Sequence, residues 1–76
     1  MKNPTPIDLR VGAALYFWRT LDGRTQTDVA EQASMVRTHY CASENSRRGT
    51  GTKNFLRLAD ALNVSPYILA LTMEAF

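Results

Sequence analysis

The sequence predicts an all-α protein that folds as one compact domain of five helices. Two observations lead to this prediction. Apolar residues recur three and four positions apart along most of the chain, which is the spacing of one helix face. No segment shows the apolar and polar alternation that is typical of a strand, and capping residues precede several of the apolar segments. With 76 residues, the chain is close to the lower size limit for a single core.

The first predicted helix covers about residues 8–21, where apolar residues such as Leu15 and Trp18 lie at helical spacing. Before this helix, residues 1–7 are expected to form a flexible tail, because the two prolines in MKNPTP oppose regular structure. Residues 8–76 then make up the single domain.

Capping signals mark the second and fifth helices. Thr25, followed three residues later by Asp28, predicts a helix that ends near Ala33. Ser65 followed by Pro66 is a strong signal for the start of the last helix. The third, fourth and fifth helices are expected at about residues 37–45, 53–62 and 66–73.

Composition narrows the class of protein. Apolar residues make up 45% of the chain and charged residues 21%, which is typical of a compact domain. The longest apolar run, VGAALYFW, is too short to span a membrane, and the first ten residues lack the apolar stretch of a signal peptide. One cysteine cannot form an internal disulfide, so we expect a cytoplasmic protein that packing alone stabilises.

The basic residues are unevenly distributed. Five of the nine lie between positions 37 and 57, where Glu44 is the only acid. A basic stretch of this kind suits an anionic polymer such as a nucleic acid. From charge alone, a solvated basic face is an equally good interpretation.

The residues do not favour catalysis or metal binding. His39 and Cys41 are the only residues of their kinds, and two positions apart on a helix they point in different directions. A metal site needs three or four convergent ligands. The chain also shows no nucleophile and base that a small domain could hold in a pocket. We therefore expect no enzyme activity, metal, cofactor or small-molecule ligand, and an exposed Cys41 thiol.

Two short helices joined by a tight turn, the second of them polar, form a helix-turn-helix arrangement. The segment TQTDVAEQASMVRTHYCASEN, followed by LADALNVSPYIL, resembles the Cro/CI-type (XRE-like) helix-turn-helix domain of phage repressors and small bacterial transcriptional regulators. The resemblance extends from about Leu9 to Leu71 and implies a compact λ-repressor-like fold. Its most specific matches are Gln26, Ala30 and Glu44, together with the segment ALNVS.

The sequence departs from the family pattern at five positions in and around the third helix. Ser34 stands in the turn where family members usually carry glycine, and Ser46 replaces the glycine that usually follows the helix. Val36 stands where a polar cap usually begins the helix. Tyr40 and Ser43 occupy two positions that are usually aliphatic.

The resemblance implies that the third helix enters the major groove of double-stranded DNA. Base contacts then come from Arg37, Thr38 and Ala42. Arginine can donate two hydrogen bonds to guanine O6 and N7, and the Ala42 methyl suits the methyl group of thymine. The resemblance also implies phosphate contacts, and charge and location add two more. The phosphate contacts implied by resemblance are Gln26, Asn45 and Lys53, and those added from charge are Arg47 and Arg48.

Two further expectations concern stability and assembly. The resemblance implies that Arg19, late in the first helix, pairs with Glu44 beneath the third helix. The C-terminal end is more apolar than one small core requires, which favours a two-fold dimer interface, although completing the monomer core is the alternative. The residues expected in that interface are Leu69, Leu71, Met73 and Phe76.

These observations favour a sequence-specific DNA-binding transcriptional regulator that binds a near-palindromic operator as a homodimer. A phage-type repressor, a restriction–modification controller protein and an antitoxin-like autorepressor all fit. The alternative is a protein-interaction module of helix-turn-helix fold, such as an antirepressor, antitoxin or adaptor, whose third helix binds a protein partner. The basic stretch favours DNA.

Overall fold

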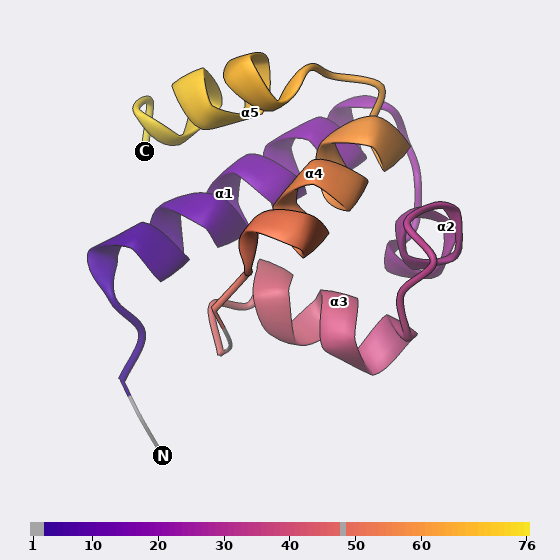
Figure 1. The fold of residues 1–76 in the computed structure, drawn as a ribbon, viewed down its shortest axis with the longest axis horizontal. Coiled ribbons are helices and arrows are strands. Elements are labelled where there is room, and N and C mark those ends of the chain that lie inside the picture. The colour runs from indigo at the N-terminus through magenta and orange to yellow at the C-terminus, as the bar shows by residue number, and fades with distance from the viewer. Residues whose placement is uncertain (1–2, 48) are drawn as a thin grey trace.

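The computed structural model describes residues 3–47 and 49–76, and these residues form five α-helices and no strand. The predicted all-α class and the number of helices are therefore confirmed (Figure 1). The helices are α1 (Pro6–Leu21), α2 (Gln26–Gln32), α3 (Arg37–Glu44), α4 (Thr52–Ala61) and α5 (Pro66–Met73).

The start of α1 differs from the prediction. The helix begins at Pro6, two residues before Asp8, because Thr5 caps it: the Thr5 hydroxyl accepts from the Asp8 backbone N–H at 3.1 Å, and the Asp8 carboxylate accepts from the Thr5 N–H at 3.0 Å. Proline is tolerated here because the first helical residue has no intrahelical N–H bond to lose. Pro6 and Ile7 therefore belong to the helix, and residues 1–2 of the expected tail lie outside the described part.

The capping signals predicted for α2 and α5 give accurate starts. Thr25 and Asp28 form a complete capping box at α2, and the Ser65 hydroxyl accepts from the Ile68 N–H at α5. By contrast, α3 and α4 begin after Val36 and Gly51, which provide no side-chain cap. A hydroxyl cap is thus missing at the start of α3.

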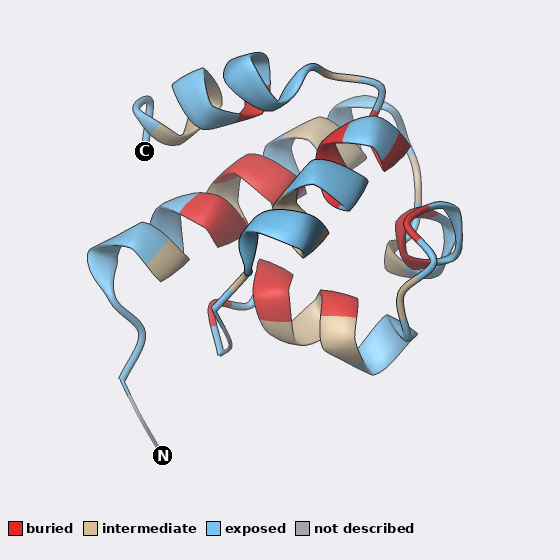
Figure 2. Cartoon of the chain, in the orientation of Figure 1, coloured by how far each residue is buried: buried red, intermediate tan, exposed pale blue. Residues whose placement is uncertain are grey.

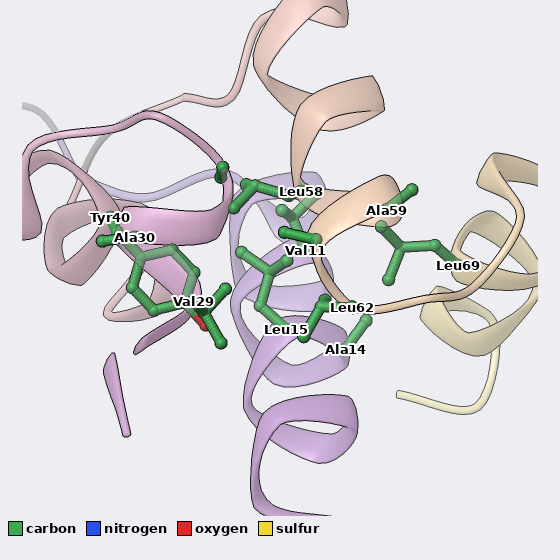
Figure 3. Close-up of a cluster of buried hydrophobic side chains, with 12 residues drawn as sticks. Val11, Ala14, Leu15, Val29, Ala30, Tyr40, Leu58, Ala59, Leu62 and Leu69 are labelled. Carbon is green, nitrogen blue, oxygen red and sulfur yellow. The ribbon is translucent and has the colours of Figure 1, made fainter. Parts of the chain in front are cut away.

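All five helices contribute to one core. The helix α1 packs against α3 and α5, α2 packs against α3 and α4, and α4 packs against α5. Figure 2 shows the buried residues on the facing sides of these helices, and Figure 3 shows side chains that meet between them. Each helix supplies a fully buried side chain, namely Leu15, Val29, Tyr40, Leu58 and Leu69.

Ser34 and Ser46 stand where the family that the sequence resembles usually has glycine, and both adopt the backbone conformation that glycine favours. Ser34 has φ of 57° and Ser46 has φ of 62°, both in the left-handed region. After α2, the Ser34 N–H donates to the Glu31 carbonyl at 3.1 Å and the Met35 N–H donates to the Ala30 carbonyl at 2.8 Å. This is the Schellman pattern of a helix end. The turn between α2 and α3 therefore keeps its geometry without glycine.

The end of α3 lies directly against α1 at Gly12. A Cβ atom at this position would lie 2.4 Å from the Glu44 carbonyl oxygen and 2.7 Å from Ser46 Oγ, which is closer than atoms can approach. Ser46 Oγ also donates to the Asp8 carbonyl at 3.1 Å. The absence of a side chain at Gly12 thus sets the distance between α1 and α3.

Candidate nucleic-acid interface

The helix α3 has a buried side and an exposed side. Tyr40 and Ser43 are buried against the core, so both take the inward positions that are aliphatic in the family. Arg37 and Thr38 are exposed at the N-terminal end, which appears pale blue in Figure 2. Ala42, one turn later, is half-buried. The outward side therefore presents a guanidinium, a hydroxyl and a methyl group.

A network of hydrogen bonds anchors the inward side of α3. Both oxygens of Glu44 accept from Arg19: Oε2 from Nε at 2.8 Å and Oε1 from Nη2 at 2.7 Å. The Tyr40 hydroxyl donates to Oε2 at 2.6 Å, and Gln26 Nε2 donates to Oε1 at 3.2 Å. The carboxylate thus joins α1, α2 and α3, and it places Arg19 and Glu44 where the resemblance expects a pair.

Charge favours this arrangement. Burial raises the pKa of Glu44. The hydrogen bonds from Arg19, Tyr40 and Gln26 together lower it by more than burial raises it, so the pKa lies below the ordinary value. Burial and the adjacent carboxylate raise the pKa of the Tyr40 hydroxyl. At neutral pH, Glu44 is therefore ionised and Tyr40 is a neutral donor, and the network holds α3 at a fixed angle.

Gln26 and Cys41 are positioned differently from what the sequence suggests. Cys41 is half-buried, and its thiol donates to Gln26 Oε1 at 3.0 Å, which corrects the expectation of an exposed thiol. The Gln26 amide therefore contacts both Glu44 and Cys41, and one of its two N–H groups remains for another acceptor. These contacts connect separate helices, so no local pattern in the sequence signals them.

A shallow hollow lies between the start of α2 and the start of α3. Arg24 borders it, but the Arg24 guanidinium already donates to Asp22 at 2.7 Å, to Gln32 and to the Ala61 carbonyl. Arg37 makes no ion pair with any residue that the structure describes. The lining residues are Arg19, Arg24, Thr25, Gln26, Thr27 and Arg37.

The other candidate contacts lie beyond the C-terminal end of α3. Asn45 and Arg47 are exposed in the loop that leads to α4, and Lys53 is exposed in the first turn of α4. The loop geometry is fixed by the Arg47 N–H, which donates to the Ala42 carbonyl at 2.8 Å. Arg48 lies outside the described residues.

Three solved structures share this arrangement of helices. The restriction-modification controller protein C.AhdI from Aeromonas hydrophila is 29% identical, with a TM-score of 0.79 over 82% of this chain and 94% of that chain. The clp gene regulator ClgR from C. glutamicum is 20% identical, with a TM-score of 0.87 over 96% and 94%. The wild-type restriction-modification controller protein C.Esp1396I is 22% identical, with a TM-score of 0.85 over 91% and 90%. The chain has the Cro/CI-type helix-turn-helix fold.

No family model matches the sequence, and no curated protein matches it significantly. The assignment of the helix-turn-helix domain therefore rests on the arrangement of α2 and α3 within the five helices.

The C-terminal end of this helix-turn-helix domain requires one correction. Leu69 is fully buried in the core of the single chain, so it is not available to an interface. Met73 is half-buried and packs against the core. Leu71 and Phe76 are 47% and 54% exposed, and the Phe76 ring lies 6.2 Å from that of Phe17. In α5, Thr72 is the one residue with an aliphatic hydroxyl among mostly apolar neighbours, so the helix gives no clear periodicity from which the buried side can be predicted.

Within residues 3–47 and 49–76, no group of three or more His, Cys, Asp or Glu side chains could hold a metal ion. None of the helices formed by these residues is long and apolar enough to cross a membrane.

Proposed function

We propose that this protein binds double-stranded DNA in a sequence-specific manner and regulates transcription, with α3 in the major groove. The observation that carries the proposal is the division of α3 into a side anchored through Tyr40 and Glu44 and a side that exposes Arg37 and Thr38. A recognition helix needs a rigid anchor so that its outward side chains reach base edges at a defined depth.

The residues in this proposal have separate roles. Arg37, Thr38 and Ala42 contact bases, because they lie on the outward side of α3. Gln26 donates its remaining N–H to a phosphate at the edge of the hollow. The other proposed phosphate contacts are Asn45, Arg47 and Lys53, which lie beyond the C-terminal end of α3. Arg48, which follows Arg47 in the sequence, is proposed from its charge.

Among the possible regulators, a restriction–modification controller protein is favoured. C.AhdI, which bears that description, is 29% identical over 82% of this chain. C.Esp1396I, also described as a controller protein, has the same fold.

We also propose a two-fold dimer that joins α5 of two chains. One recognition helix reads too few base pairs to select a site in a genome, and a dimer places two helices about one turn of B-DNA apart, roughly 34 Å. With Leu69 excluded, the interface consists of the exposed apolar residues of this end. They are Ile68, Leu71 and Phe76, with Phe17 and Met73 beside them.

The test is selection of bound DNA from a pool of duplexes with a random central region. We expect enrichment of one near-palindromic sequence, hereafter the enriched duplex. Arg37→Ala should weaken binding to the enriched duplex by about 1–3 kcal/mol and relax the preference at one base pair per half-site. Arg10→Ala, which removes an exposed arginine of α1, is the matched control. It should change neither the affinity for the enriched duplex nor the base preference. A pool without enrichment would instead favour the protein-interaction module.

A further inference from the structure

Val36 is an exposed apolar residue at the start of the recognition helix. The residue is 69% exposed, although removing a valine side chain from water lowers the free energy. The residue before it, Met35, packs against the core, so the two neighbours point to opposite sides of the chain. Val36 therefore belongs to the outward surface that also carries Arg37 and Thr38.

The Val36 side chain cannot cap α3, because valine has no side-chain hydrogen-bond acceptor. Val36 is the N-cap of α3, and the hydroxyl groups of Thr5, Thr25 and Ser65 perform this role at α1, α2 and α5. Serine, threonine, aspartate and asparagine are the residues that stabilise such a position. The sequence thus has an apolar group in place of a stabilising one, at a site where it contacts nothing in the core.

The backbone holds this side chain in a fixed place. The Val36 carbonyl accepts from the His39 N–H at 3.0 Å and from the Tyr40 N–H at 3.1 Å, so the residue belongs rigidly to the first turn of α3. Two residues earlier, the Schellman hydrogen bonds at Ser34 fix the path of the turn. The backbone that carries Val36 is therefore already fixed in the unbound chain.

The major groove offers one apolar feature that a valine can bind. Base edges there carry hydrogen-bond donors and acceptors, except for the methyl group at C5 of thymine. Cytosine acquires the same methyl group at the same ring atom when it is modified to 5-methylcytosine. Valine has no polar side-chain atom, so it can recognise this methyl group and no other part of the edge.

We propose that Val36 binds the 5-methyl group of one pyrimidine per half-site, from either thymine or 5-methylcytosine. The proposal rests on the proposed function, because it requires α3 in the major groove. Its consequence is that methylation of cytosine at this position strengthens binding. DNA modification would then act directly on the affinity of this protein for its operator.

The experiment measures the affinity of the intact protein for the enriched duplex and for versions in which single thymines are replaced by uracil, which lacks only the methyl group. The position that Val36 contacts in each half-site should show a loss of about four-fold in the unaltered protein, which corresponds to burial of one methyl group. The same position should show no loss in Val36→Ser, which distinguishes it from a thymine contacted by Ala42. At that position, a second pair of duplexes carries cytosine or 5-methylcytosine opposite guanine. The methylated duplex should bind about four-fold more tightly than the unmethylated one.

The Val36→Ala variant should remove most of this dependence on the methyl group. Val36→Ser removes both methyls and restores a cap, so it should be at least as stable as the unaltered protein and still lose the dependence. Leu9→Ala, at an exposed apolar residue of α1, should keep it. If every position that distinguishes thymine from uracil in the unaltered protein still does so in Val36→Ser, the proposal is overturned.

The outcomes separate the two levels of the argument. A pool without any enriched duplex would contradict the proposed function and this inference together. An enriched duplex that binds equally well without each thymine methyl, and without preference for 5-methylcytosine, would contradict the inference alone. Dependence at thymine without an effect of 5-methylcytosine would identify thymine as the source of the methyl group and overturn the methylation effect.

Discussion

Glu44 is an acid that lies in the interior beneath a basic surface. Its side chain is only 4% exposed, and it accepts hydrogen bonds from Arg19, Tyr40 and Gln26. Removing one partner of a buried pair leaves the other charge without compensation. This carboxylate is therefore a residue on which both the fold and the angle of α3 depend.

We expect Glu44→Ala to lower the free energy of unfolding by about 3–5 kcal/mol at neutral pH, because Arg19 then keeps a half-buried charge without its partner. Chemical denaturation monitored by circular dichroism measures this loss. Glu31→Ala, at an exposed acid of α2, is the control and should change stability by less than about 0.5 kcal/mol. Equal stability of Glu44→Ala and the unaltered chain would show that the pair contributes little.

The pH dependence of stability follows from the same residue. The pKa of Glu44 is lower in the folded chain than the ordinary value of 4.5, so its contribution is complete above that pH and is lost as the pH falls through the folded pKa. The unfolding free energy should decrease below pH 4.5, and less so in Glu44→Gln. Asp28 also contributes stability that is lost as the pH falls, since hydrogen bonds from Thr25 lower its pKa. The Asp28→Asn variant measures the contribution of Asp28 to this pH dependence separately.

For the helices, short sequence patterns such as capping residues predict where a helix begins better than they predict how helices pack. The starts of α2 and α5 follow from Thr25 and Ser65, because a cap is a contact between near neighbours in the sequence. Thr5 followed by Pro6 is the same kind of signal as Ser65 with Pro66. The sequence-based prediction treats that proline only as a helix breaker, and it therefore places the start of α1 two residues late.

The candidate site is predictable to a similar degree. The outward positions of Arg37 and Thr38 follow from their place at the start of a polar helix. The contact of Gln26 with Cys41 depends on how α2 and α3 pack, and helical spacing within one element contains no information on that packing. The family resemblance supplies the Arg19 and Glu44 positions, which lie 25 residues apart.

The packing of α1 on α3 gives a prediction at this scale. Gly12→Ala should destabilise the fold by about 1–3 kcal/mol or more, because its Cβ would meet the Glu44 carbonyl at 2.4 Å and force the helices apart. Gly49→Ala is the matched control, since a Cβ there meets only the Asp8 carboxylate, at an ordinary 3.8 Å. Thermal unfolding of both variants checks this. An unchanged melting temperature for Gly12→Ala would contradict the close approach.

At the scale of the whole molecule, the exposed apolar end of α5 gives a prediction about assembly. We expect a dimer in sedimentation experiments on the intact protein at tens of micromolar. Leu71→Lys should give a folded monomer with weaker DNA binding, because a charge at the interface opposes burial. Leu56→Lys, at a similarly exposed residue of α4, should remain dimeric. If the protein stays monomeric both alone and on the enriched duplex, the proposed dimer interface is wrong.

If the outward surface of α3 and its flanks bind DNA, the affinity for DNA must depend strongly on salt concentration. Each phosphate contact contributes about −0.9 to the slope of log K against log salt concentration. We expect a steep, linear fall in affinity for the enriched duplex as salt concentration rises. The slope should be smaller by about one in Lys53→Ala or Arg47→Ala and unchanged in Arg10→Ala. An absence of DNA binding at about 50 mM salt, or a slope unaffected by either substitution, would contradict this expectation.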